Sequence, residues 1–379
     1  MTVKEVRIVS DLSAEPAHET VREVCIDTPL GVGAAHETAG EARANTGLSA
    51  NSAHRDVVDS SERLEAGCTG PCLADKQAAI TTAAISAIAN RHPCFAQGKP
   101  NGKGRIHLPV SPGCNIGCRF CERSINRHEQ RPGVTAQHLK PAEAAELIAD
   151  ALALAPELSV VGIAGPGDTL ASPYALRTFC LIKEQFPHLL RCLSTNGLLL
   201  KDRLPELLEA GIDTLTVTVN DIDHVRLAQI VEYVIYEGRR YTGTEATKLL
   251  VAKQLAGIKA AAAAGLLIKV NTVLIPSING EHIGSIAQAV KQAGAGLYNI
   301  IPLLPSAKMA HLAAPTCRQI DAARQAAEEH ISVFRHCRHC RADAIGIPGG
   351  KDIGEQLYLR RNLSGVRAAT VQANTFSHG

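Results

Sequence analysis

The sequence predicts an α/β protein built on a partial (βα)6 barrel, because short apolar runs alternate with helical stretches from residue 105 onward. Right-handed crossovers curl such a parallel sheet, and the loops that follow its strands then meet at one edge. The six strands are expected at Arg105–Val110, Val160–Ala164, Arg191–Ser194, Thr214–Val219, Ile268–Ile275 and Leu297–Leu304.

Helix signals lie between several of these strands. A proline opens one stretch at a position that favours proline, and a glycine directly follows two others. The expected helices are Asp75–Asn90, Pro141–Leu154, Thr247–Ala264 and Glu281–Ala293.

The N-terminal part of the chain has a different composition. Residues 1–74 are rich in Ala, Ser, Thr, Glu and Gly without a sustained period, which predicts a largely disordered, flexible leader. We therefore expect the barrel with its flanking segments in residues 75–350 and a C-terminal tail in residues 351–379.

Composition argues against several classes of partner. The net charge is +2, Trp is absent, and no apolar run approaches the roughly 20 residues that cross a bilayer, so neither a nucleic acid nor a membrane is expected. The chain opens without a secretory signal, so its 12 cysteines are expected in the reducing cytoplasm, where thiols serve metals or catalysis.

Cys114, Cys118 and Cys121 follow the first predicted strand with the spacing CxxxCxxC. Three thiolates can hold three irons of a [4Fe–4S] cluster and leave the fourth iron open to a substrate or cofactor. The alternatives are buried thiols or a zinc site, but zinc normally takes four ligands and no nearby residue supplies an obvious fourth. The spacing therefore predicts an iron–sulfur cluster at the carboxyl edge of the barrel.

Glycines and small polar residues follow the next strands at the same edge. Glycines let a backbone approach a ligand closely, and a buried amide or carboxylate needs a hydrogen-bonding partner that a cofactor can provide. The alternatives are a structural turn after the second strand and a helix cap after the third. The candidate cofactor-binding residues are Gly165, Gly167, Asp168, Ser194, Asn196, Asn220 and Asn271.

Cys94 lies upstream of the barrel in the sequence HPCF, and Cys337 and Cys340 lie downstream in HCRHC. Taken alone, the downstream pair could be half of a zinc site or a redox pair, and Cys94 could be a core residue. Because both flank a barrel that already holds one predicted cluster, auxiliary iron–sulfur clusters are the favoured interpretation.

Other cysteines carry weaker signals. Cys68 and Cys72 form a CxxxC pair in the predicted leader, where the alternatives are metal binding and a solvated flexible segment. Cys180 falls inside a predicted helix and Cys192 inside a predicted strand, so we assign both to packing, and the sequence leaves the role of Cys317 open.

The order of motifs along residues 85–350 resembles the NifB family, the radical S-adenosylmethionine (SAM) proteins of nitrogenase cofactor biosynthesis. The matching motifs are HPCF, RIHLPV, CNIGCRFC, RPGV, AGPGD, LSTNG, YEGRRY, NTVLIP and HCRHCRADA. The resemblance implies that SAM binds the open iron, that the turn with Asp168 faces the SAM ammonium, and that two auxiliary [4Fe–4S] clusters are present.

The resemblance also implies a reaction and its partners. The enzyme would fuse two [4Fe–4S] clusters, with a SAM-derived carbide and a sulfur, into an eight-iron precursor of the nitrogenase cofactor. Its partners would be a cluster donor, cofactor carrier or scaffold proteins, and an electron donor such as ferredoxin or flavodoxin. Two other functions stay open, namely a radical SAM enzyme that modifies a peptide or small molecule and an inactive cluster carrier.

The chain departs from the family at several places: no histidine follows HPCF in the segment Ala96–Pro100, the segment Ser306–Thr316 is shorter than expected, and one cysteine is missing. The family pattern carries a further cysteine between CxxC and RPGV, where this chain has the segment Glu122–Gln130. His128 and Glu129 are the candidates to replace that ligand.

Overall fold

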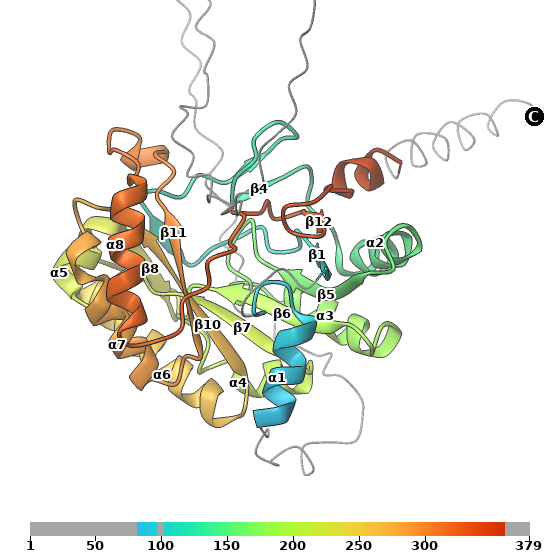
Figure 1. Cartoon of the computed structure of the whole chain (residues 1–379), viewed down its shortest axis with the longest axis horizontal. Helices are drawn as coiled ribbons and strands as arrows, with labels where there is room; N and C mark the ends of the chain where they lie inside the picture. The colour runs from blue at the N-terminus through green and yellow to red at the C-terminus, as the bar shows by residue number, and fades with distance from the viewer. Residues whose placement is uncertain (1–81, 97–101, 361–379) are drawn as a thin grey trace, which may run out of the picture. The chain divides into compact units, whose positions relative to one another are not determined.

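The computed structural model describes residues 82–96 and 102–360 (Figure 1), so the predicted leader and the Cys68–Cys72 pair lie outside the described residues. Within this part of the chain a curled sheet has the strand order β11-β10-β7-β6-β5-β1-β12. These strands are β1 (Gly104–His107), β5 (Leu158–Ile163), β6 (Leu190–Thr195), β7 (Thr214–Thr218), β10 (Leu267–Leu274), β11 (Leu297–Pro302) and β12 (Ile345–Gly346).

Six of these strands are parallel to their neighbours, and the prediction of a partial (βα)6 barrel is confirmed. The seventh, β12, pairs antiparallel with β1 and was not predicted. It is only two residues long, so its sequence carries no periodicity that could reveal it. Through β12 the segment that bears the downstream cysteines returns to the first strand.

Helices cover the outer face of the sheet (Figure 1). The predicted helix at 141–154 is confirmed with the same bounds, and the backbone N–H of Lys140 donates to the Glu143 carboxylate at its start, 2.8 Å away. The helices are α1 (Thr82–Arg91), α2 (Pro141–Leu154), α3 (Tyr174–Gln185), α4 (Leu204–Glu209), α5 (His224–Ile230), α6 (Gly243–Ala263), α7 (Ile283–Gln292) and α8 (Cys317–Glu328), with 3-10 turns η1 (Gly280–His282) and η2 (Ala307–Met309).

Helix α3 is the helix in which Cys180 was expected, whereas three helices, α4, α5 and α8, were not predicted. Two of them, α4 and α5, are six and seven residues long, too short for a helical period to stand out. In α8 the buried residues are only Ala323 and Ala327, so its apolar face is narrow. Its start is fixed by a capping box in which Thr316 and Gln319 bond each other's backbone N–H.

Two small sheets flank the barrel. One joins β2 (Ile116–Cys118) to β8 (Val231–Tyr236) and β9 (Arg239–Thr242), and the other joins β3 (Ser124–Ile125) to β4 (Val134–Thr135). The β8–β9 hairpin turns at Glu237 and Gly238, both with positive φ. Because β2 contains Cys118, this hairpin fixes the backbone of the first cysteine motif.

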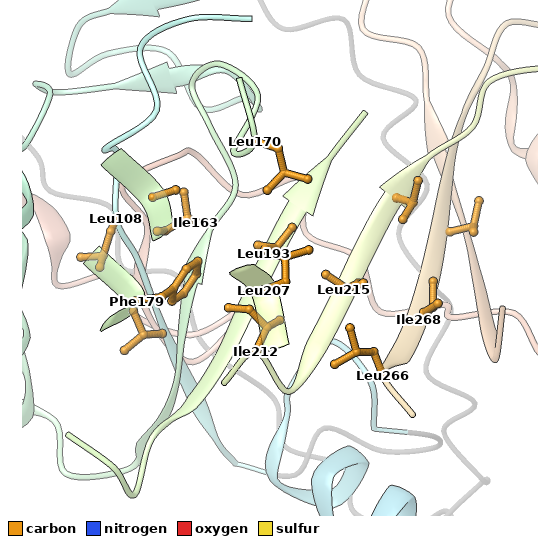
Figure 2. Close-up of a cluster of buried hydrophobic side chains, with 14 of the residues drawn as sticks. Leu108, Ile163, Leu170, Phe179, Leu193, Leu207, Ile212, Leu215, Leu266 and Ile268 are labelled. Atoms are coloured by element: carbon orange, nitrogen blue, oxygen red, sulfur yellow. The ribbon is translucent and has the colours of Figure 1, made fainter. Parts of the chain in front are cut away.

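The main core lies between the sheet and its covering helices. Successive strand residues point to opposite faces, so alternate positions bury leucine, isoleucine and valine against the helices while the others face the barrel interior. Residues 354–360 form a further helical segment, and Leu357 and Tyr358 are buried in the same core. Figure 2 shows Ile163, Leu193, Leu215 and Ile268 on neighbouring strands and Leu108 directly after β1, with Phe179 of α3 and Leu207 of α4 beside them.

The described residues contain no helix that is long and apolar enough to span a membrane.

Phe179→Ala should lower the free energy of unfolding by about 3–5 kcal/mol, because Phe179 is fully buried in the main core and its removal leaves a cavity. Tyr174→Ala on the same helix is the control, since Tyr174 is 39% exposed and its loss should cost less than about 1 kcal/mol. Urea unfolding followed by circular dichroism measures both. Equal losses in the two variants would contradict the described packing of α3.

Candidate functional site

The first cysteine motif lies in the loop after β1 and in β2, at the carboxyl edge of the sheet. Cys114 and Cys118 are half-buried, Cys121 is exposed, and the three thiols are close enough to act on one another electrostatically. Burial, reinforced by the nearby Asp168 carboxylate, raises the pKa of Cys114 to about 12. Iron would offset this cost by stabilising the thiolates, so the donor set fits an iron–sulfur cluster.

The turn after β5 is clamped onto this cysteine loop. The backbone N–H of Gly167 donates to the carbonyl of Ser111 at 2.6 Å, and the N–H of Asp168 donates to the carbonyl of Gly113 at 2.8 Å. A Cβ atom on Gly167 would lie 1.9 Å from the Gly113 oxygen. The close approach that glycine permits here is therefore between two loops of the protein. Gly165 has φ +133°, a left-handed value that also favours glycine.

Asp168 is buried beneath the mouth of the barrel, and its carboxylate bonds the loop after β6. It accepts hydrogen bonds from the N–H of Asn196 at 2.6 Å, the hydroxyl of Thr195 at 2.9 Å and the N–H of Leu170 at 2.9 Å. Burial raises the pKa of Asp168, and these hydrogen bonds oppose that rise. The carboxylate thus joins the loops after β5 and β6.

Asn196 reaches from β6 to the cysteine motif. Its side-chain N–H donates to Asn115 Oδ1 at 2.6 Å and lies 3.8 Å from Cys114 Sγ. Asn115 is a residue that sequence reasoning missed, and its own amide nitrogen is buried without a partner in the described part of the chain. An unsatisfied donor beside three thiols is suited to a ligand of the cluster.

The carboxyl edge of the sheet also carries Ser194, Asn220 and Asn271, each with different hydrogen-bond partners. Ser194 is the last residue but one of β6, and its carbonyl accepts a hydrogen bond from the Thr169 hydroxyl. The amide oxygen of Asn220 accepts from the backbone of Val273 at 3.0 Å, which ties the loop after β7 to β10.

Asn271 faces the barrel interior, and the amide of Asn299 on β11 donates to its oxygen at 3.0 Å. Asn299 was missed from the sequence, although it occupies the register position opposite Asn271. The Asn299 amide oxygen is buried without a partner among the described residues.

The structure brings Cys94, Cys337 and Cys340 together in the barrel interior. Cys94 and Cys337 pack against a cluster that contains Phe95 and Phe334, and the thiols of Cys337 and Cys340 both act electrostatically on that of Cys94. This cluster, which also contains Leu190 and Leu297, gathers near the amino ends of the strands, whereas the first motif lies at their carboxyl ends. Cys94 and Cys337 thus pack nearer the amino ends of the strands than the first motif does.

Several groups that the sequence analysis did not select face these thiols. Arg105 on β1 donates to Cys340 Sγ at 3.2 Å, and Lys269 on β10 donates to the carbonyl of Cys94 at 3.1 Å. The thiol of Cys192, assigned to packing, belongs to the same apolar cluster and interacts electrostatically with Cys94. Arg105, Lys269 and Cys192 each lie inside a strand at a position that faces the barrel interior. The alternation of inward-facing and outward-facing positions along a strand is the sequence signal that could have identified them.

Two histidines complete this interior group. His92 accepts a hydrogen bond from the Cys94 N–H at 3.1 Å through Nδ1, while its Nε2 is buried without a partner in the described part of the chain. Burial, with the nearby Arg105 charge, lowers the pKa of His107 to about 4, so this imidazole is neutral at physiological pH.

The segment that replaces the family cysteine is a surface network of polar side chains. The Glu129 carboxylate accepts hydrogen bonds from Arg131, Asn126 and Ser124, so both of its oxygens have partners, and His128 is exposed. Among the described residues, no three Cys, His, Asp or Glu side chains converge on a site for a single metal ion.

The downstream segment is tied to this network. Arg341 donates to the carbonyls of Glu129 and Asn126 at 2.6 and 2.8 Å, and its guanidinium pairs with Asp343 at 2.8 Å. The Asp343 carboxylate in turn accepts from the backbone of Ala136. These contacts hold the segment with Cys337 and Cys340 against the loop that follows the first motif.

Comparison with known proteins gives consistent matches. A model described as the radical SAM superfamily matches residues 108–290. The chain is 42% identical over 297 residues to the FeMo cofactor biosynthesis protein NifB of Methanocaldococcus infernus, a match that covers 78% of this chain and 98% of that protein. The protein of the same name from Methanocaldococcus jannaschii is 44% identical over 277 residues, covering 73% and 92% of the two chains. For that of Klebsiella pneumoniae the identity is 40% over 287 residues, covering 74% and 59%.

Gly167→Ala should lower the free energy of unfolding by about 1–3 kcal/mol and reduce iron incorporation at the first motif, because the new Cβ would strike the Gly113 carbonyl. Gly113→Ala is the matched control on the other side of the same contact, where a Cβ meets nothing within 4 Å. Thermal unfolding and iron counting after anaerobic reconstitution compare the two. A Gly167→Ala protein that behaves like Gly113→Ala would contradict the clamp.

Proposed function

Because the chain belongs to the NifB family of radical SAM proteins, we propose that it fuses two [4Fe–4S] clusters into an eight-iron precursor of the nitrogenase cofactor. A carbide from SAM and a sulfur would enter the product. Membership of the radical SAM superfamily implies one [4Fe–4S] cluster and SAM as resident cofactors. The finer proposal is carried by one observation, the second group of thiols that faces the interior of the same barrel.

The first motif would hold the resident cluster. When bound together with SAM, this cluster would supply the electron that breaks a carbon–sulfur bond of SAM. Cys114, Cys118 and Cys121 are the proposed ligands, and Asn196 lies beside Cys114 where it can orient the bound amino acid group of SAM. The other residues proposed to line the SAM site are Gly165, Gly167, Asp168, Ser194, Asn220 and Asn271.

The interior group would hold the substrate clusters. Cys94, Cys337 and Cys340 approach from segments that lie far apart in the sequence, and Arg105 and Lys269 place positive charge beside them. Phe95, Phe334 and their neighbours close the amino end of this space with apolar side chains, which keeps water away from oxygen-sensitive iron. A substrate held here lies in the same barrel as the SAM site.

Partners follow from this chemistry. The reaction needs a donor of [4Fe–4S] clusters, a low-potential electron donor such as ferredoxin or flavodoxin, and a carrier or scaffold protein to receive the product. We expect the protein to work in the cytoplasm, where these thiols stay reduced.

A radical SAM enzyme that modifies a peptide or small molecule is the second candidate. It would use the interior thiols for electron relay, and an inactive cluster carrier would use them for storage. The product separates these functions, since cluster fusion yields 5′-deoxyadenosine and S-adenosylhomocysteine without an organic product, and the carrier cleaves no SAM.

Cys337→Ala should lower the iron content by about one cube, because a thiolate ligand of the interior group is lost, while SAM still binds at the first motif. Cys118→Ala is the complementary variant and should abolish 5′-deoxyadenosine formation. In the parent protein, label from methyl-labelled SAM should remain in acid-labile cluster material. One cube per fully reconstituted chain, or label only in an organic molecule, would contradict cluster fusion.

Asp168→Ala should weaken SAM binding about ten-fold or more without removing iron. It removes both a charge proposed to face the SAM ammonium and the hydrogen bonds that hold Asn196 beside Cys114. Asp202→Ala is the control, since Asp202 is an exposed partner of Lys253. Equilibrium dialysis with labelled SAM measures the affinity, and an unchanged value would make the turn at Asp168 purely structural.

A further inference from the structure

Lys269 is a cation buried inside the barrel. The residue is 6% exposed and lies on β10, in a strand whose other side packs on the main core. Its Nζ donates to the carbonyl of Cys94 at 3.1 Å and lies 4.9 and 5.1 Å from the ring centroids of Phe95 and Phe334. The ammonium group is therefore held beside Cys94 and the apolar cluster against which Cys94 and Cys337 pack.

This charge has no carboxylate partner among the described residues. Arg191, by contrast, pairs with Asp213 at 3.3 Å, and Arg105 has the half-exposed Asp352 at 3.8 Å. An ammonium group has three donors, and one carbonyl and two aromatic faces compensate only part of the cost of removing its charge from water. A buried cation in this condition is suited to an anion that binds beside it.

The chemistry of the neighbouring groups identifies that anion. Cys94, Cys337 and Cys340 are its nearest candidate ligands, and the Lys269 charge acts on the thiols of Cys94 and Cys192. Arg105 adds a second cation, with one guanidinium nitrogen 3.2 Å from Cys340 Sγ and its Nε buried without a partner in the described part of the chain. An iron–sulfur cube ligated by thiolates carries net negative charge, so it fits a space with this excess of positive charge.

We propose that Lys269 is the electrostatic partner of an anionic iron–sulfur cluster held by the interior thiols, and that it favours the reduced form of that cluster. The inference rests on the proposed function, which places a cluster at these thiols. One-electron reduction adds one negative charge and neither forms nor breaks a bond, so a fixed cation nearby raises the reduction potential. Lys269 is thus a positioning and tuning residue rather than a ligand.

Two variants separate charge from hydrogen bonding. Lys269→Gln keeps a donor and loses the charge, whereas Lys269→Arg keeps both. Lys259→Gln is the control, because Lys259 is exposed on α6. Each change is made in a protein that also carries Cys114→Ala, Cys118→Ala and Cys121→Ala, so that the remaining iron belongs to the interior group.

The measurement is a dithionite titration of anaerobically reconstituted protein, followed by electron paramagnetic resonance, with iron counting and circular dichroism on the same samples. In Lys269→Gln the midpoint potential should fall by at least the equivalent of a tenfold change in the one-electron equilibrium, about 59 mV. Lys269→Arg and Lys259→Gln should keep the parent potential.

The outcomes distinguish this inference from the proposed function. Cluster iron with an unchanged potential in Lys269→Gln would overturn the role of Lys269 and leave the proposed function intact. If the protein that carries only the three changes in the first motif holds no iron at the interior thiols, the proposed function itself is overturned. Loss of iron in Lys269→Gln but not in Lys269→Arg would support the charge partnership, and loss in both folded variants would show that Lys269 serves packing alone.

Discussion

The contact between two loop backbones governs the mouth of this barrel. The loop after β1 carries the first cysteine motif, and hydrogen bonds from Gly167 and Asp168 hold it against the turn after β5. The Asp168 carboxylate accepts a hydrogen bond from the backbone N–H of Asn196 after β6, and the Asn196 side chain contacts Cys114. Three loops from consecutive parallel strands are thereby fixed relative to one another before any cofactor binds.

The barrel interior changes in character from one end of its strands to the other. Near the amino ends, aromatic and aliphatic side chains form a closed apolar layer that includes Phe95 and Phe334. Next to it lie the cations Arg105 and Lys269 with the second set of thiols, and the amides Asn271 and Asn299 meet further along the strands. Each layer requires residues at alternate positions of several strands, which explains why charged and amide residues interrupt otherwise apolar segments.

The sequence was informative wherever a local pattern carries the information. Alternation of apolar runs predicted all six parallel strands, and the Pro141 start predicted the bounds of α2. The grouping of Cys94 with Cys337 and Cys340 came from flanking motifs, and their contact depends on β12, which has no local signature. Lys269 stands out in the run LLIKVNTVLIP, but its importance depends on the side of the strand that it occupies.

Local sequence patterns do not show contacts between separate elements, and this explains what was missed at Cys192 and at the turn with Gly167. Cys192 does pack in an apolar cluster, as expected, yet its thiol also faces Cys94, a relation between elements that strand propensity cannot give. Glycine at 167 indicated a close approach, but a sequence does not say whether a ligand or another loop occupies the space.

The antiparallel pairing of β12 with β1 determines the order in which contacts can form during synthesis and folding. Arg105 lies in the first strand of the barrel, whereas Cys340 and Gly346, which its guanidinium contacts, are more than 200 residues later. The loops after β5 and β6 and the β8–β9 hairpin, which contact the first cysteine motif, all end by Thr242, whereas the interior group also needs the pairing of β12 with β1 near Gly346. Contacts of such long sequence separation form late in folding. The interior group of thiols is therefore assembled only after β12 has paired with β1, later than these contacts at the mouth of the barrel.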